Sequence, residues 1–319
     1  MNPTRFESAA VIGTGMMGPG IAVTLALGGL RTTLLSRREE TARAGLAKAL
    51  SQVDLLERHE LASPEAAQRA RRLLCASADF EAAVAGAALV VESGPETMEY
   101  KQEVFERMDA ITPAEAVLAS NTSGLSITAI ASRCRRPERV LTTHFWNPPH
   151  LMPLVEIVKG ERTAPELVEE IRCLLEHCGK VPVVVYKDTP GQLGNRLQMA
   201  LVREAVNIVE RGIADAEAVD LAARTGFGLR LPVYGILEHQ DMVGLDLGIR
   251  VVDYVTRDLN NEPGAPRLMR EMVERGELGV KTGKGFYDWS KRDPEEARAR
   301  RDNFVLEFLK AQRRRREPA

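Results

Sequence analysis

The feature that most constrains the fold is a glycine-rich segment close to the start of the chain. Residues 9–13, AAVIG, form a short apolar run and lead into GTGMMG, which places glycine at positions 13, 15 and 18. The following IAVTLALGG has helical length and ends in glycines, where helices commonly stop. A strand, a tight turn and a helix in this order are typical of dinucleotide-binding folds, because a pyrophosphate can then approach the free N–H groups at the helix start.

We therefore predict that this loop binds a dinucleotide. Its expected cofactor-binding residues are Gly13, Gly15, Met16, Met17 and Gly18. A merely glycine-rich turn is the alternative interpretation. The cofactor interpretation is favoured because the strand before the loop, the helix after it and a second strand ending at residue 36 fall at the expected distances.

The end of the second strand bears on which dinucleotide is bound. Folds that prefer NAD usually carry an acid there, which accepts hydrogen bonds from the ribose hydroxyls. This chain has Ser36, Arg37 and Arg38 instead. A small hydroxyl and two cations suit a 2′-phosphate, so we expect NAD(H) or NADP(H), with a tilt toward NADP(H). In the alternative, both arginines point into solvent and pair with Glu39 or Glu40.

The rest of the first half alternates between strand-like and helical patterns. The run TTLLS (32–36) is followed by a long charged and apolar segment that predicts a helical hairpin broken near Ser63-Pro64. Further strand-like runs are expected at 88–93, 116–123, 139–145, 154–158 and 180–186. Such alternation predicts an α/β fold with a Rossmann-like domain, whose mainly parallel sheet is covered on both faces.

The pattern changes after KDTPG (187–191). The segments RLQMALVREAVNIVERG, DAEAVDLAARTG and LGIRVVDYVTRDL are helical, and no clear strand follows. We therefore predict a dinucleotide-binding domain over residues 1–187 and an all-α domain over residues 188–319. The chain ends in a segment that predicts a terminal helix with an apolar stripe, formed by Phe304, Val305, Phe308 and Leu309.

Charge and composition restrict the partners. The sequence has 43 Lys and Arg against 45 Asp and Glu, which gives a net charge of -2. The chain therefore has no excess of positive charge that would attract nucleic acid or an anionic membrane. No stretch approaches the roughly 20 apolar residues that span a bilayer, and the N-terminus resembles no signal peptide. The four cysteines lack metal-binding or disulfide spacing. We expect a cytosolic protein without a metal site, whose partner is a small molecule.

Four further segments, read with the glycine loop, resemble the 3-hydroxyacyl-CoA dehydrogenase family. They are VVESGPETMEYKQEVF (90–105), SNTSGLSI (120–127), HFWNPPHLMPLVEIVKG (144–160) and KDTPGQLGNRL (187–197). VGLD (243–246) and GVKTGKGFYDW (279–289) match the family's C-terminal end. The resemblance spans nearly the whole chain. It implies a helical C-terminal domain that dimerises, an active site in the cleft between the domains, and a place in fatty acid metabolism.

The resemblance also implies roles for individual residues. The residue matching His144 is the family's general base, and the one matching Glu156 is its carboxylate partner. Ser123 and Asn195 match residues that bind the reacting oxygen, and Asn147 matches a neighbouring asparagine of the same site.

Three further residues are expected at the cofactor. Glu92 and Lys101 match positions near its nicotinamide end, and Asn121 is also expected to contact it. His150, in the turn after Pro148-Pro149, is expected to be a substrate-side or surface residue rather than a base.

Elementary chemistry agrees with this assignment. Oxidising a secondary alcohol requires hydride to leave carbon while a base takes the hydroxyl proton, and imidazole is suited to that task. A carboxylate bonded to the other ring nitrogen fixes the tautomer and stabilises the imidazolium. We therefore predict His144 and Glu156 as a general acid/base pair, with Ser123 and Asn195 holding the oxygen by hydrogen bonds.

The substrate stays open between three hypotheses. A 3-hydroxyacyl-CoA and 3-ketoacyl-CoA pair comes first. The predicted hairpin weakens it, because LAKALSQVDLLERHE mixes acids with the cations that CoA phosphates would need, and the family's GPFE is altered to residues 235–238, GILE. A small non-CoA hydroxy acid or aldehyde comes second. A catalytically inactive cofactor-binding protein comes third, although the joint presence of the candidate catalytic residues argues against it.

Overall fold

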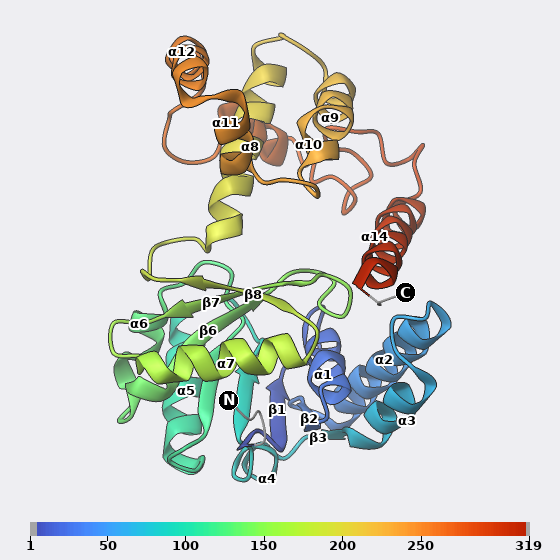
Figure 1. The fold of residues 1–319 in the computed structure, drawn as a ribbon, viewed down its shortest axis with the longest axis vertical. Helices are drawn as coiled ribbons and strands as arrows, with labels where there is room; N and C mark the ends of the chain where they lie inside the picture. Colours follow the sequence, from blue (N-terminus) through green and yellow to red (C-terminus); the bar gives the residue numbers. More distant parts are fainter. Residues whose placement is uncertain (1–4, 317–319) are drawn as a thin grey trace. The chain divides into compact units, whose positions relative to one another are not determined.

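The computed structural model describes residues 5–316, which divide into two compact units (Figure 1). The first unit contains the residues up to Asn195 together with those from Arg300 onward, and the second contains Arg196–Ala299. The boundary expected between residues 187 and 188 lies shortly before this division. The terminal segment, which the sequence assigns to the second domain, groups with the first.

An eight-stranded sheet forms the centre of the first unit, in the order β3-β2-β1-β4-β5-β6-β7-β8. Neighbouring strands are parallel, except that β6 and β7 are antiparallel. The strands are β1 (Ser8–Ile12), β2 (Arg31–Leu35), β3 (Leu74–Ser77), β4 (Leu89–Glu92), β5 (Val117–Ser120), β6 (Val140–Phe145), β7 (Leu154–Lys159) and β8 (Val181–Val185). The predicted α/β, Rossmann-like fold with a mainly parallel sheet is confirmed.

Helices cover both faces of this sheet. One face packs on α1 (Gly18–Leu27), α2 (Glu39–Arg58), α3 (Pro64–Leu73) and α7 (Pro165–His177). The other packs on α4 (Phe80–Val84), α5 (Met98–Ile111) and α6 (Ile127–Ile130). Alternate strand residues serve the two layers: Val11 belongs to the first core, whereas Ala10 and Ile12 belong to the second. Short 3-10 turns span Ala131–Arg133 and Pro137–Arg139.

Strand β3 is an element that the sequence pattern does not reveal. The helical hairpin breaks at Ser63-Pro64 as expected, with Ser63 capping α3 by accepting from the N–H of Ala66 at 3.2 Å. Leu74 then begins β3 directly after Leu73, the last residue of α3. Because no turn residue separates helix from strand, a four-residue edge strand resembles the end of the helix.

The second unit is helical, with α9 (Ala216–Thr225), α10 (Phe227–Arg230), α11 (Ile236–Val243), α12 (Leu245–Val255) and α13 (Arg267–Glu274). Helix α8 (Leu193–Glu210) leads into it, and α14 (Pro294–Arg316) leads out. Within Arg196–Ala299, all of which the structure describes, no strand forms, and the buried residues are Val206, Asn207, Gly248 and Met272. Its side chains are therefore largely uncovered in the single chain.

The expected apolar stripe on the terminal helix α14 differs from the structure at Phe304 and leaves out one buried residue, whereas Val305, Phe308 and Leu309 are half-buried. Leu306, which the prediction leaves out, is buried at 1% exposure in the core of the first unit, whereas Phe304 is 67% exposed. Val305 packs against the same core. Across residues 5–316, none of the helices combines the length and apolarity that crossing a membrane requires.

Candidate active site

The candidate catalytic pair lies on the antiparallel pair β6–β7. His144 and Glu156 are directly opposite each other in the register, so their side chains leave the sheet on the same face. His144 Nδ1 lies 2.6 Å from Glu156 Oε2. Both residues are buried, with exposures of 6% and 0%. The sheet thus brings a carboxylate to one ring nitrogen of an imidazole in a site with little water.

Three N–H groups converge on the Glu156 carboxylate. Besides His144, the indole Nε1–H of Trp146 donates to Oε2 at 3.0 Å, and the backbone N–H of Gly194 donates to Oε1 at 2.7 Å. Burial by itself raises the pKa of Glu156, but these bonds outweigh it, so the pKa lies below its usual value. The carboxylate is therefore held ionised, as a partner for an imidazolium must be.

Trp146 is a site residue that the sequence prediction leaves out. A signal for it exists, because residues 144 and 146 lie two apart at the end of one strand and so share a face. Its donor role becomes visible only when β7 is placed beside β6.

Ser123, in the loop after β5, and Asn195, near the start of α8, are in contact. The Asn195 side-chain amide donates to the Ser123 carbonyl at 2.9 Å. The Ser123 N–H donates to Glu96 Oε1 at 2.8 Å. Because Gly194 and Asn195 are consecutive, the start of α8 bonds to Glu156 with one residue and to Ser123 with the next. One continuous set of contacts therefore connects all four candidate catalytic residues.

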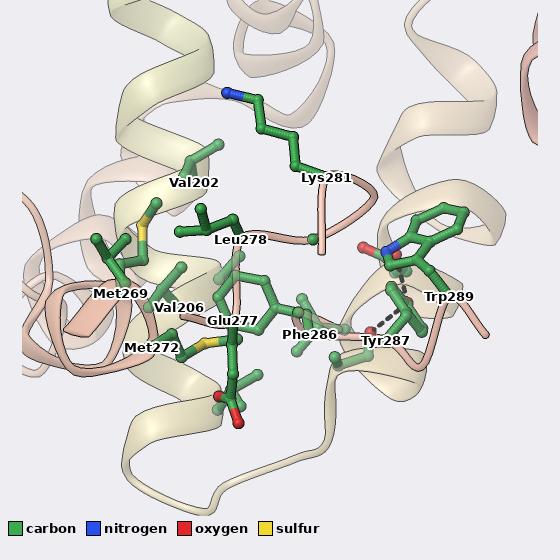
Figure 2. A pocket seen from close by; sticks show the side chains of 18 residues that line it. Val202, Val206, Met269, Met272, Glu277, Leu278, Lys281, Phe286, Tyr287 and Trp289 are labelled. Carbon is green, nitrogen blue, oxygen red and sulfur yellow. Dashed lines mark hydrogen bonds between the residues drawn. The ribbon is translucent and has the colours of Figure 1, made fainter. Parts of the chain in front are cut away.

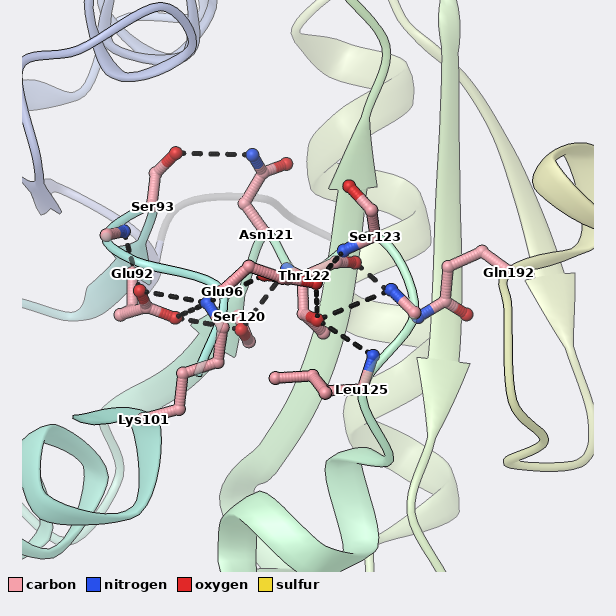
Figure 3. A network of polar contacts seen from close by, with 12 residues as sticks. Glu92, Ser93, Glu96, Lys101, Ser120, Asn121, Thr122, Ser123, Leu125 and Gln192 are labelled. Atoms are coloured by element: carbon pink, nitrogen blue, oxygen red, sulfur yellow. Dashed lines mark hydrogen bonds and ion pairs between the residues drawn. The ribbon is translucent and has the colours of Figure 1, made fainter. Parts of the chain in front are cut away.

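Figure 3 shows the buried network behind this loop. Glu92 and Lys101, exposed by 0% and 1%, pair with each other: Lys101 Nζ lies 2.8 Å from Glu92 Oε2. Glu92 also accepts from the Ser120 hydroxyl and the N–H of Gly94. Both side chains are closed to solvent, so they lie behind the site rather than at its surface.

Glu96 is the exposed acid of this network, and the sequence prediction leaves it out. It pairs with Lys101 at 3.3 Å and accepts from the Thr122 hydroxyl at 2.5 Å. Burial tends to raise the pKa of Glu96, but the bond from Thr122, the charge of Lys101 and the bond from Ser123 lower it overall. Glu96 thus fixes the backbone at Ser123 by a hydrogen bond and is itself held by the ion pair with Lys101.

Asn121 joins the loop after β5 to the catalytic strand. Its side-chain carbonyl accepts from the N–H of Phe145, next to His144, at 2.9 Å, and its amide donates to the Ser93 hydroxyl at 3.2 Å. These bonds leave the position of Asn121 tightly defined between β4, β5 and β6.

The turn after β6 carries Asn147 and His150. Asn147 is exposed and forms a cis peptide bond with Pro148. His150 is half-buried, and its Nδ1 has no hydrogen-bond partner among the described residues. Burial and the nearby Lys180 lower the pKa of His150 to about 4, which fits a neutral imidazole facing a substrate or the chain. Residues 5–316 contain no cluster of three His, Cys, Asp or Glu side chains that could hold a metal.

The glycine loop fits a dinucleotide pyrophosphate. Gly13 has a φ of 106°, a conformation that side chains disfavour, and a Cβ on Gly18 would lie only 1.8 Å from the Gly13 carbonyl oxygen. A Cβ on Gly15 would meet open space. Met17, the N-cap residue before α1, provides no side-chain cap, and Met16 is 66% exposed. The first N–H groups of α1 therefore face a position open to a ligand.

A cavity of about 820 Å³ adjoins this loop at the ends of β1 and β2. Ser36, Arg37 and Arg38 line it together with Tyr100. The Ser36 hydroxyl lies 2.7 Å from that of Thr41 and accepts from that of Thr14 at 3.3 Å. The Arg37 guanidinium lies 6.0 Å from the centre of the Tyr100 ring. The cavity lies beside the end of β2, where dinucleotide-binding folds place the adenosine ribose, next to the topological switch point between β1 and β4.

Comparison with known proteins identifies the family to which this chain belongs. The 3-hydroxyacyl-CoA dehydrogenase NAD binding domain matches residues 8–189, and the C-terminal domain of the same family matches residues 191–289. The chain belongs to the 3-hydroxyacyl-CoA dehydrogenase family, as its sequence predicts, and it is an NAD-dependent oxidoreductase of the type that acts on CH–OH groups.

Individual relatives differ in their substrates. The 5-formyl-3-hydroxy-2-methylpyridine 4-carboxylate 5-dehydrogenase of Mesorhizobium japonicum is 37% identical over 296 residues, covering 92% of this chain and 93% of the relative. A crystal structure of such a dehydrogenase, described as an NAD+ dependent dismutase, has a TM-score of 0.89 at 33% identity and covers 96% and 99% of the two chains. The (S)-3-hydroxybutyryl-CoA dehydrogenase of Ralstonia eutropha has a TM-score of 0.74 at 31% identity and covers 90% and 100%.

Proposed function

We propose that this chain interconverts a hydroxyl compound and its carbonyl counterpart, with His144 and Glu156 as the general acid/base pair. The observation that carries the proposal is the 2.6 Å contact between His144 Nδ1 and Glu156 Oε2. It leaves Nε2 as the nitrogen that exchanges a proton with the substrate. Glu156 holds the ring orientation and stabilises the imidazolium.

Each candidate residue then has a separate role in the reaction. A bound nicotinamide supplies the hydride acceptor in oxidation and the hydride donor in reduction. In oxidation, His144 Nε2 takes the hydroxyl proton, and in reduction it returns a proton to the oxygen. We propose that Ser123 and Asn195 hold that oxygen, with Asn147 beside them, and that Glu92 and Lys101 act on the cofactor site indirectly, by fixing Glu96 and Gly94.

Two substrate classes remain candidates. The family match favours a 3-hydroxyacyl-CoA and its 3-ketoacyl-CoA product. A small non-CoA aldehyde or hydroxy acid is favoured by a specific observation: the similarity to the pyridine dehydrogenase structure covers 96% of this chain, against 90% for the 3-hydroxybutyryl-CoA dehydrogenase, with the higher TM-score.

A substrate panel separates these classes. Acetoacetyl-CoA, free 3-keto acids and small aldehydes are offered with reduced or oxidised cofactor, and the absorbance of the reduced form is followed. We expect turnover within one class at a specificity constant at least about tenfold above the other, because thioester and free acid need different contacts. Turnover on neither class, with tight cofactor binding, would instead support a cofactor-binding protein without catalysis.

NAD(H) is the cofactor class that the family supports, and we propose that the adenosine end also admits the 2′-phosphate of NADP(H). The support is local: Arg37 and Arg38 line the cavity after β2, where an acid would repel that phosphate. We expect the wild type to bind NADPH at least as tightly as NADH. Arg37→Ala should weaken NADPH binding about tenfold, the loss of one charge-assisted bond, and NADH binding less than twofold.

The control for this measurement is Arg43→Ala, at an exposed position on α2 that does not line the cavity. Its two dissociation constants should equal those of the wild type. Equal NADH and NADPH affinities that Arg37→Ala leaves unchanged would contradict the phosphate site.

We propose further that the second unit mediates a homodimer. On α12, Leu245, Ile249 and Val252 are each at least half exposed. The same unit holds an apolar cavity of about 570 Å³, lined by side chains from α8, α9, α13 and residues 277–289 (Figure 2). Apolar burial is the main favourable term in folding, so a unit with so small a core needs a covering surface. A second copy carries the same helix and cavity, which a twofold axis can pair reciprocally.

The cytosolic location stays a prediction.

A further inference from the structure

Trp146 lies beside the acid/base pair and is hydrogen-bonded to its carboxylate. Its indole Nε1–H donates at 3.0 Å to Glu156 Oε2, the same oxygen that lies 2.6 Å from His144 Nδ1. The other oxygen of Glu156 accepts the N–H of Gly194. His144 and Trp146 therefore share one carboxylate oxygen as two donors.

The indole is fixed in this position by its neighbours. A Cβ on Gly194 would lie 2.5 Å from Trp146 Cζ2, so the absence of a side chain at residue 194 lets the ring lie against the start of α8. The Trp146 and His144 rings are 5.8 Å apart between centroids, at an interplanar angle of 55°. The ring thus has contacts on several sides, which hold its N–H on the carboxylate.

We propose that Trp146 is a positioning residue that tunes the acid/base pair, by drawing part of the Glu156 charge away from the proton of His144. A carboxylate that accepts two N–H bonds at one oxygen spreads its charge over both donors. Without the indole, the same carboxylate would hold the imidazolium proton more strongly. The inference rests on the proposed catalytic role of His144 for its kinetic consequence only.

The surroundings of the carboxylate leave His144 as its charged partner. Across from Glu156 on β8 stands Val183, and the start of α8 contributes a backbone N–H. Lys180, at the beginning of β8, donates to two carbonyls of the turn after β6, and Asp188 accepts from Ser126 and from the N–H of Thr128 at α6. Helix α7 packs on the opposite face of the sheet, toward which Phe145, Val155 and Ile157 point.

The kinetic test is Trp146→Phe, which keeps a flat apolar ring and deletes the donor. We expect the acid limb of kcat/KM against pH, measured for alcohol oxidation, to move upward by about half to one pH unit, because the base loses its proton at higher pH. NADH binding should stay unchanged. The control is Phe304→Tyr, which alters an exposed aromatic ring on α14 outside the site and should keep the wild-type profile. An acid limb at the wild-type pH in Trp146→Phe would overturn the proposal, whatever happens to kcat.

An optical test needs no substrate. In the Trp289→Phe background, Trp146 is the one tryptophan left of the two in the sequence, so its fluorescence reports on the adjacent imidazole. We expect its emission to change with pH, and Glu156→Gln to move that change to lower pH. Emission independent of pH would overturn the proposal. Because this titration proceeds without turnover, failure of the inference and failure of the proposed function are distinguishable.

Discussion

Replacement of His144 by glutamine is expected to lower turnover by on the order of a hundredfold or more, while leaving NADH binding intact. Glutamine approximates the volume of histidine but cannot carry a proton to or from the substrate oxygen. His144 is 6% exposed and lies on β6, whereas the glycine loop and the adenosine cavity are built by β1, α1 and β2. Steady-state kinetics on the best substrate of the panel, with NADH binding followed by fluorescence, check this expectation.

The matched control is His177→Gln, which exchanges the same residue type on α7, where the His177 ring contacts the Gly28 carbonyl. It should turn over as the wild type does. If His144→Gln also keeps near wild-type turnover, the assignment of His144 as the base is wrong. A loss of NADH binding in step with activity would point to damage of the fold rather than to missing chemistry.

Replacement of Ile249 by aspartate on α12 is expected to raise the dimer dissociation constant by on the order of a hundredfold, about 2.7 kcal/mol. Ile249 is 60% exposed in the single chain, so water can solvate a carboxylate there before association. In the dimer, the carboxylate would be desolvated against apolar side chains, which is costly without a partner charge. Sedimentation equilibrium or light scattering across a dilution series checks the change in mass.

Phe304→Asp serves as the control, because Phe304 is 67% exposed on α14 in the part that groups with the first unit. Its dimer dissociation constant should equal that of the wild type. A wild-type chain that is monomeric at micromolar concentration would refute the homodimer. An Ile249→Asp dimer as tight as the wild type would remove α12 from the interface.

Local patterns suffice for the parts of the fold whose signals are contiguous in the chain. The strand, glycine turn and helix over residues 8–27 can be predicted because each step is dictated within a few residues. Strand β3 escapes prediction because it has four residues, starts directly after α3 and derives its structure from pairing with β2. On α14, the pattern indicates a helix but cannot say which side faces the first unit, so Leu306 is missed.

The candidate site shows the same division. His144 and Glu156 are accessible to sequence reasoning because both stand in one recognisable segment of the family. Glu96 is not, and for Trp146 the spacing indicates the shared face but not the donor role, because both roles come from partners on other strands or loops. Glu96, for example, accepts from Thr122 and Ser123, which follow β5. The order and register of the strands bring such side chains together. Neither strand order nor register can be predicted from a short stretch of sequence.

The antiparallel pairing of β6 with β7 has a consequence for how such a site can diversify. Because the ladder places residues 144 and 156 face to face, the separation of the proton-carrying groups is independent of the shape of the connecting segment 147–153, which follows Trp146. That connection is therefore free to change its length and side chains, and with them the molecules it admits, as long as the two strands keep their alignment. A slip of one residue would turn every side chain of one strand to the other side and separate acid from base at once.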